Sequence, residues 1–259
     1  MKIVLLALSC ALPGSGLFAC SYPNFYAAEM GWIMEEPFTV ECLAKSAAID
    51  SIPFTRLVDS VRKKYPDVFI SAQILPIRVD VEERKNSDKA PIVRVMTGSH
   101  GKINFVARFE KKIPSLAHMD SIFSSPARKK IIDQLVKNRI VLLVLRGADK
   151  EENKRFLACA QKGSRMARDM VNKTCAIVEA DLADGREKYL FRNIFGLDTP
   201  AKPGVLVLFG KGKGLHLITD PGQHKIVLDM CQMLDNTTNV NSSDLMPRII
   251  LNMPLPKFK

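Results

Sequence analysis

Cysteine is the residue in this chain most able to do covalent chemistry, and the spacing of its six cysteines excludes the commonest use of paired thiols. No two of them form a Cys-x-x-Cys motif, in which a second thiol resolves the mixed disulfide made by the first. Ordinary dithiol exchange is therefore excluded. Cys42, Cys159, Cys175 and Cys231 each lie in an apolar segment, which favours packing as small hydrophobic residues. In an oxidising compartment they could instead pair as disulfides, whose connectivity the sequence does not reveal.

The other residues with catalytic or ligand chemistry show no usable arrangement. The four histidines, at positions 100, 118, 216 and 224, lack metal-ligand spacing. The Gly-Lys-Gly-Lys-Gly sequence over 210–214 joins two predicted strands and lacks the Gly-x-x-x-x-Gly-Lys-Ser/Thr pattern of a phosphate-binding loop. We therefore predict no catalytic constellation, no metal and no cofactor, and a basic β-turn at 210–214.

The formal net charge of +11 favours partners that carry negative charge, such as an anionic membrane surface. The alternative is that the charge only keeps the surface solvated. The basic residues are spread along the chain, and no RNP motif, zinc-finger spacing or helix-turn-helix signal accompanies them. Nucleic acid is therefore not an expected partner.

The first residues resemble an export signal. The apolar run over 3–12 is too short for a permanent membrane span, and a Pro-Gly-Ser-Gly sequence breaks it. Leu17, Ala19 and Cys20 then occupy the −3, −1 and +1 places of a bacterial lipobox. We predict a signal peptide over 1–19 and an exported chain, periplasmic or anchored on the extracytoplasmic side of a membrane. Cys20 is the candidate lipidation site, and cleavage after Ala19 without lipid is the alternative.

Two segments repeat one pattern of proline, strand, glycine turn, strand and helix. The first hairpin covers 90–109 and the second covers 202–219, and their prolines, Pro91 and Pro203, are 203 − 91 = 112 residues apart. This offset is about the size of one small domain.

The segments around each hairpin predict the same order of elements. In the first half, strands at 38–43 and 68–77 flank a helix that starts at Pro53, and a helix from Ser125 to about Asn138 follows the hairpin. In the second half, the pattern predicts strands at 140–145 and 176–181 and helices at 151–171, 187–195 and 225–234. Alternating strands and helices predict a parallel core, to which the hairpin adds antiparallel strands.

We therefore predict an α/β fold of two tandem domains, each a central mixed sheet flanked by helices, at 37–138 and 139–236. An N-terminal arm over 20–36 precedes them, and a C-terminal tail over 237–259 follows. The apolar run at 247–253 in the tail is predicted to dock back as an edge strand and to leave a basic, proline-rich end.

This order, with a proline just before each hairpin, resembles the thioredoxin fold. Ile177–Asp181, Phe195–Leu197 and the segment from Pro203 to Gly212 carry the resemblance, which covers 139–236 closely and 37–138 more loosely. It implies two tandem thioredoxin-like domains in which Pro91 and Pro203 are cis prolines whose neighbouring backbone pairs with a peptide. The alternative is a trans proline that opens an edge strand.

The resemblance also indicates where redox chemistry is missing. A thioredoxin-type enzyme carries its two thiols where the first strand of the domain meets its helix. The corresponding junctions here, 44–51 and 146–153, contain no cysteine. The expected function is an exported, redox-inactive module that binds a peptide or protein or acts as a scaffold, similar to the non-catalytic domains of protein disulfide isomerase or calsequestrin. The alternative is a peroxidase-like or transferase-like enzyme that uses a single thiol, Cys159 or Cys42, as its nucleophile.

Overall fold

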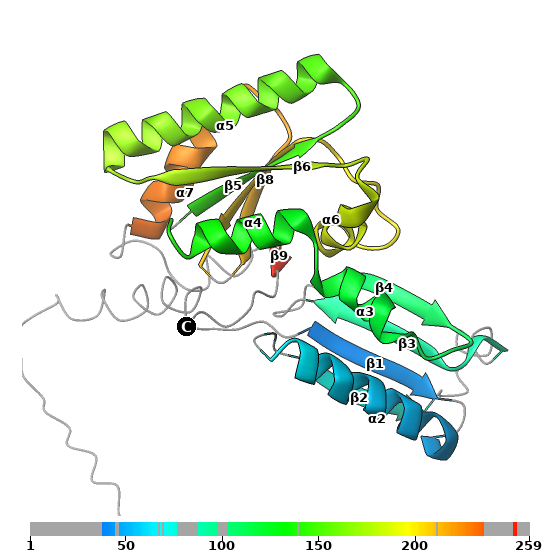
Figure 1. Ribbon diagram of the computed structural model, residues 1–259. Helices are drawn as coiled ribbons and strands as arrows, with labels where there is room; N and C mark the ends of the chain where they lie inside the picture. The colour runs from blue at the N-terminus through cyan, green and yellow to red at the C-terminus, as the bar shows by residue number, and fades with distance from the viewer. Residues whose placement is uncertain are drawn as a thin grey trace, which may run out of the picture.

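The computed structural model describes residues 38–44, 47–66, 68, 70–76, 88–97, 103–138, 140–210, 212–235 and 251–252. Within these residues two mixed sheets follow one another along the chain, and helices flank each of them (Figure 1). The predicted α/β fold of two tandem sheet-and-helix domains is confirmed. The predicted signal peptide, the N-terminal arm and most of the C-terminal tail lie outside the described residues.

The first unit is a four-stranded sheet with the order β2-β1-β3-β4. β1 runs parallel to β2 and antiparallel to β3, and β4 pairs antiparallel with β3. Its elements are β1 (Phe38–Ala44), α2 (Ala47–Lys64), β2 (Ile70–Pro76), β3 (Ile92–Thr97), β4 (Asn104–Glu110) and α3 (Leu116–Phe123).

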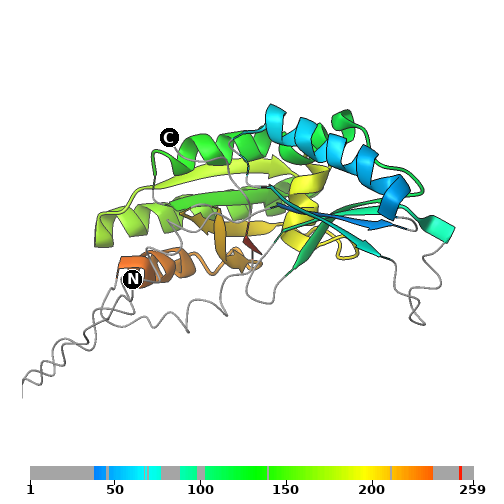
Figure 2. The same ribbon diagram turned by 90° about the horizontal axis from the view of Figure 1, so that it is seen from below.

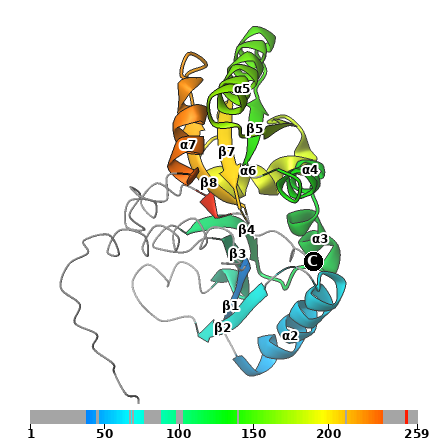
Figure 3. The ribbon, with the colours of Figure 1, turned by 90° about the vertical axis from the view of Figure 1, so that its left-hand side faces the viewer.

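Both helices of the first unit cover the same face of its sheet (Figure 3). Alternate side chains of β1, beginning with Phe38 and Val40, are buried against apolar residues of α2 and α3. The next residue along, Glu41, turns to the opposite face and accepts a hydrogen bond from Arg94 at 2.7 Å. The period of two in β1 therefore separates an apolar face from a face that carries a partly buried ion pair.

Two helices of this unit differ from the prediction. α2 begins at Ala47, so Pro53 lies inside the helix rather than at its start. α3 was not predicted, although Leu116, Met119, Ile122 and Phe123 have helical spacing and pack into the core.

The second unit has the strand order β6-β5-β7-β8-β9, and its first four strands repeat the pairing of the first sheet. Its elements are α4 (Pro126–Leu135), β5 (Ile140–Arg146), α5 (Lys150–Val171), β6 (Cys175–Asp181), the 3₁₀ turn η2 (Gly185–Glu187), α6 (Lys188–Phe195), β7 (Gly204–Phe209), β8 (Lys213–Ile218), α7 (Lys225–Asp235) and β9 (Leu251–Asn252).

Helices cover both faces of the second sheet (Figure 1). Ile140, Leu142 and Val144 of β5 share one core with α5 and α7. Val141, Leu143 and Leu145 share a separate core with α4 and α6. β5 is thus buried on both sides, which explains why its sequence is continuously apolar.

Part of the tail docks as an edge strand of the second sheet. β9 pairs antiparallel with the start of β8, with Asn252 opposite Lys213 and Leu251 opposite Gly214. The predicted edge strand is confirmed for these two residues. Lys213, predicted as part of a basic β-turn, instead opens β8 and is 3% exposed.

α6 lies between the two sheets and contacts β4 of the first unit (Figure 2). Asn193 of α6 makes the connection. Its side-chain Nδ2 donates to Thr97 Oγ1 at 2.6 Å, and its backbone carbonyl accepts from Asn104 Nδ2 at 2.6 Å. Its Oδ1 accepts from the guanidinium of Arg128 at 3.2 Å. One buried side chain therefore joins both units.

α4 packs against β5 and β6, although the predicted boundary near Asn138 would assign it to the first domain. Arg128 of α4 is 3% exposed, and its guanidinium carbon lies 5.4 Å from the centre of the Phe38 ring. Burial lowers the pKa of Arg128 to about 10, against the opposing effect of the Glu187 carboxylate. That carboxylate also accepts from the backbone N–H of Ala127 at 2.8 Å. We therefore treat α4 as part of the second unit.

Among the described residues, no helix combines the length and the apolar character needed to cross a membrane.

Candidate functional site

The junction between β5 and α5 holds the site at which the thioredoxin resemblance would place thiols. Asn153 fixes this loop by bonding Gly147 twice, because its Oδ1 accepts from the backbone N–H at 2.8 Å and its Nδ2 donates to the carbonyl at 2.9 Å. The Asp149 carboxylate caps α5 by accepting from the N–H groups of Glu151 and Glu152. The first turn of the helix, which would stabilise a thiolate in a redox enzyme, is therefore occupied by a carboxylate of the chain itself.

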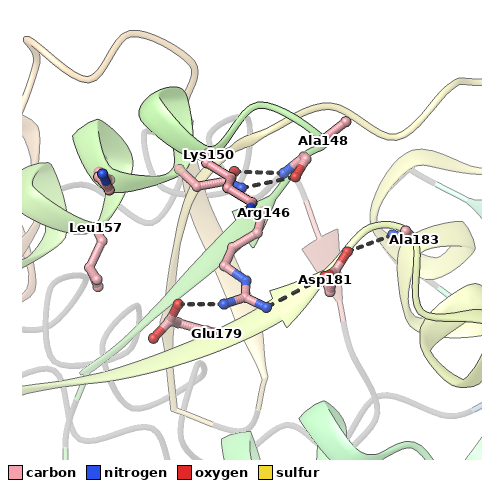
Figure 4. A pocket seen from close by; sticks show the side chains of 10 residues that line it. Arg146, Ala148, Lys150, Leu157, Glu179, Asp181 and Ala183 are labelled. Carbon is pink, nitrogen blue, oxygen red and sulfur yellow. Dashed lines mark hydrogen bonds and ion pairs between the residues drawn. The ribbon is translucent and has the colours of Figure 1, made fainter.

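A hollow of about 520 Å³ opens beside this junction at the carboxyl ends of β5 and β6 (Figure 4). Arg146 extends between two acidic side chains of β6, with 3.4 Å from its guanidinium to both Glu179 Oε2 and Asp181 Oδ2. We call this space the charged hollow, and it is lined by Arg146, Gly147, Ala148, Lys150, Asn153, Lys154, Leu157, Glu179, Asp181 and Ala183.

A second hollow of about 340 Å³ adjoins the charged hollow, because Ala183 lines both. α6 forms one of its walls, so Asn193 fixes that wall to the first unit from the other side of the helix. We call it the α6 hollow, and it is lined by Leu182, Ala183, Asp184, Gly185, Lys188, Phe191, Arg192, Gly196, Leu197, Thr199 and Ala201. The two hollows share this one lining residue, and we refer to the pair as the groove.

Pro203 lies behind this groove. Its Cγ would be 2.7 Å from a Cβ on Gly147, so only glycine fits at that position of the β5–α5 loop. Ala201 and Lys202, just before Pro203, are exposed. Within the described chain, none of the loop and turn hydrogen bonds involves the backbone of these two residues.

The two prolines occupy the same topological position in different sheets, and the structure does not bring them together. Ile92 pairs with the penultimate residue of β1, as Gly204 does with that of β5, and each follows its proline directly. The Ala90–Pro91 bond is cis, as predicted. The Lys202–Pro203 bond is not cis, so that prediction is wrong for Pro203, where the chain keeps the trans form that X–Pro bonds ordinarily favour.

The four described cysteines lie away from the groove. Burial raises the pKa of the Cys42 thiol to about 11, with a further contribution from the Asp50 charge. Burial also raises the pKa of Cys159, which is 3% exposed. Both shifts oppose the formation of the thiolate that a single-cysteine enzyme needs. Cys20 lies outside the described residues.

Sequence reasoning missed the residues that shape the groove. The alternation in Ala176–Asp181 places Glu179 and Asp181 on one face of β6, next to the strand end that carries Arg146, and this signal was available. No pattern in the sequence predicted the two hydrogen bonds between the Asn153 side chain and the Gly147 backbone. In the described part of the chain, no cluster of three or more His, Cys, Asp or Glu side chains is arranged to hold a metal ion.

Comparison with models of known protein families finds no match, and a search of curated proteins finds no similar chain.

Proposed function

We propose that this chain is a redox-inactive, thioredoxin-like module that binds an extended polypeptide along the groove formed by the charged hollow and the α6 hollow. The strand order β2-β1-β3-β4, which recurs as β6-β5-β7-β8, supports the resemblance to thioredoxin. The binding role rests on one observation. Ala201 and Lys202 are exposed, Ala201 lines the α6 hollow, and the backbone of neither residue takes part in the loop and turn backbone hydrogen bonds among the described residues.

In this proposal the bound segment pairs its backbone with that of Ala201 and Lys202, as an added strand does. Its side chains then alternate between the sheet end and the solvent. The α6 hollow has an apolar part built from Leu182, Phe191 and Leu197, whereas the charged hollow offers Arg146 between its two acids. We expect the groove to prefer segments that combine apolar and charged side chains.

The alternative of a single-cysteine enzyme has less support. Neither hollow is lined by cysteine, and the Asp149 carboxylate occupies the N-terminus of α5. The raised pKa values of Cys42 and Cys159 also oppose a nucleophilic role. Turnover of peroxide, or reduction of insulin, that disappears in a Cys159→Ser or Cys42→Ser variant would favour the enzyme instead.

The binding proposal is tested with a permanently unfolded probe, reduced and carboxymethylated α-lactalbumin that carries a fluorescent label. Fluorescence anisotropy measures its affinity for the full chain. Ala201→Pro removes one backbone N–H donor, so we expect roughly 3- to 10-fold weaker binding, the equivalent of one hydrogen bond. Ala201→Ser keeps the donor and should bind as the wild type does. Equal affinity of the proline and serine variants would contradict backbone pairing at this edge.

A second pair of variants tests the charged hollow. Glu179→Lys places a positive charge beside Arg146, whereas Asp169→Lys makes the same change on the exposed far part of α5. We expect the first variant, and not the second, to change the affinity for the probe. Equal effects would indicate a response to net charge alone.

We also propose that the chain is exported and that Cys20 begins the mature form, on the basis of its amino-terminal sequence. The mass of the protein purified from its native host tests this, and a mature chain that retains residues 1–19 would contradict it. A diacylglycerol adduct on Cys20 would distinguish lipidation from simple cleavage.

An anionic membrane surface is the second proposed partner, because the net charge of +11 attracts acidic headgroups over a Debye length of about 8 Å at physiological salt. Co-sedimentation with vesicles of neutral or anionic phospholipid, at low and high salt, tests this attraction. Binding that does not respond to lipid charge and salt would remove its support.

A further inference from the structure

Two cysteines that are distant in sequence meet in the second unit. The Sγ atoms of Cys175 and Cys231 are 3.8 Å apart, although 56 positions separate the two residues along the chain. Cys175 is the first residue of β6 and pairs with Ile140 of β5. Cys231 belongs to α7, which packs beside α5 over the same face of the sheet (Figure 3).

The two thiols differ in their access to solvent. Cys231 is 1% exposed in the core that α5 and α7 share, whereas Cys175 is partly exposed at the edge of that core. The backbone at Cys175 is held in place, because its carbonyl accepts from Ser164 Oγ of α5 at 3.1 Å. The pair therefore offers one accessible sulfur in front of one buried sulfur.

We propose that Cys175 and Cys231 form a reversible intramolecular disulfide, so that this pair is an oxidation site separate from the polypeptide groove. The sulfur atoms must approach one another by roughly 1.8 Å to reach a bond of about 2.0 Å. The hydrogen bond from Cys231 lowers the pKa of the Cys175 thiol, which agrees with Cys175 acting first.

The oxidant is a small-molecule disulfide such as glutathione disulfide. The Cys175 thiolate attacks one sulfur of the oxidant, forms a mixed disulfide and releases the first glutathione thiolate. Cys231 then loses its proton and attacks Cys175 Sγ, which releases the second glutathione as the mixed disulfide breaks. The protein loses two hydrogens in total, and the oxidant is reduced to two thiols.

The bond would join the start of β6 to α7 and enclose β6, α6, β7, β8 and the first part of α7 in one covalent loop. Cross-linking a loop of this size restricts the unfolded chain, so oxidation should raise Tm by about 5 °C or more, and dithiothreitol should reverse the shift.

The test uses the full chain with a large excess of glutathione disulfide, followed by alkylation of free thiols and peptide mapping. We expect an intact mass about 2 Da lower, a linked pair of peptides that contain Cys175 and Cys231, and full reversal by dithiothreitol. Cys175→Ser and Cys231→Ser should each abolish both the linked peptides and the Tm shift. Cys42→Ser and Cys159→Ser are matched controls that should retain them.

If Cys231→Ser does not fold, Cys231→Ala and the partly exposed Cys175→Ser variant keep the test decisive. Linked peptides in which Cys175 joins any other cysteine would overturn the proposal. Complete alkylation of Cys175 and Cys231 under denaturing conditions, after the folded wild type has been exposed to the oxidant, would overturn it as well. Neither result depends on polypeptide binding, so failure here leaves the proposed groove to its own test.

Discussion

The first sheet carries both of its helices on one face, whereas helices cover the second sheet on both faces. The segments before Pro91 and Pro203, which share one topological position, have different surroundings as a result. Beside Pro91, the carbonyl of Lys89 accepts from the N–H of Lys111 at 2.7 Å, so the chain itself uses this edge. Beside Pro203, Ala201 and Lys202 are exposed, and Ala201 lines the groove. Repetition of a topology therefore does not repeat a site, and we place the proposed binding surface in the second unit only.

The largest expected effect comes from breaking the contact between the two units. Arg128→Met removes a buried guanidinium that lies 5.4 Å from the Phe38 ring of the first unit, bonds Asn193 and opposes the charge of the buried Glu187 carboxylate. Removal of one of two opposite charges that are both buried costs about 3–5 kcal/mol of unfolding free energy, because the other charge is left uncompensated. Urea denaturation followed by circular dichroism measures it. Lys129→Met, on the exposed side of the same helix, is the control, and equal midpoints for the two variants would contradict the role of Arg128.

A smaller effect should be confined to the second unit. A Cβ on Gly163 would lie 2.6 Å from Val227 Cγ2 and 2.9 Å from the His224 carbonyl oxygen, so Gly163→Ala forces α5 and α7 apart. Overpacking of this kind costs about 1–3 kcal/mol. Gly185→Ala, where no atom lies within 4 Å of the added Cβ, should change stability by less than about 0.5 kcal/mol. Thermal unfolding of both variants decides whether the close helix approach is rigid.

The helix caps of the two units also differ. Asp149→Ala removes a carboxylate that accepts two backbone N–H groups of α5, which costs about 1 kcal/mol. Ser115→Ala at the corresponding position of α3 should cost less, because the Ser115 side chain makes no capping hydrogen bond. Chemical denaturation of the two variants gives the difference, and an equal or larger loss at Ser115 would run against it.

The smallest effect at neutral pH is expected for Tyr65→Phe, which removes one hydrogen bond of 3.0 Å to Asp120 and costs about 1 kcal/mol or less. Lys64 keeps its own contact with that carboxylate. In the wild type, burial first and the hydrogen bond to Asp120 second raise the pKa of Tyr65 from 10.0 to about 12.

This shift sets a pH dependence with a defined sign. Between pH 10.0 and about 12, folded Tyr65 keeps a proton that the unfolded chain has lost, so the unfolding free energy of the wild type falls as pH rises. The phenylalanine variant lacks this contribution. Urea midpoints at about pH 9 and about pH 11 should therefore converge between the two proteins, and a constant gap would contradict the assignment.

The pattern of apolar residues, with the prolines and glycines that separate the elements, predicted most of the fold. The continuously apolar β5 and the amphipathic α5 emerged close to their observed bounds, because length and period identify such elements. The misassigned part was the end of the first repeat. There the prediction assigned α4, which begins with a clear Ser-Pro sequence, as the last helix of the first domain, and it missed the shorter α3. Only tertiary packing assigns α4 to the second sheet.

The groove depends on information that a single sequence does not carry. The hydrogen bonds between Asn153 and Gly147 depend on how the β5–α5 loop closes. The position of α6, which forms a wall of the α6 hollow, depends on the hydrogen bond from Asn193 to Thr97, 96 positions away. The proximity of Cys175 to Cys231 likewise follows from the packing of α7 on the sheet rather than from spacing. Local pattern predicts which face of an element is buried, and it does not predict which distant side chain meets it.

Because β5 is buried on both faces, the fold does not tolerate a change in the number of residues in this strand. Because its side chains alternate between the α5–α7 core and the α4–α6 core, deletion of one residue within Ile140–Arg146 would send every later side chain into the opposite core. Both cores would then receive the wrong set of shapes at once. In relatives of this protein, insertions and deletions should therefore fall outside β5, while apolar exchanges within it remain tolerated.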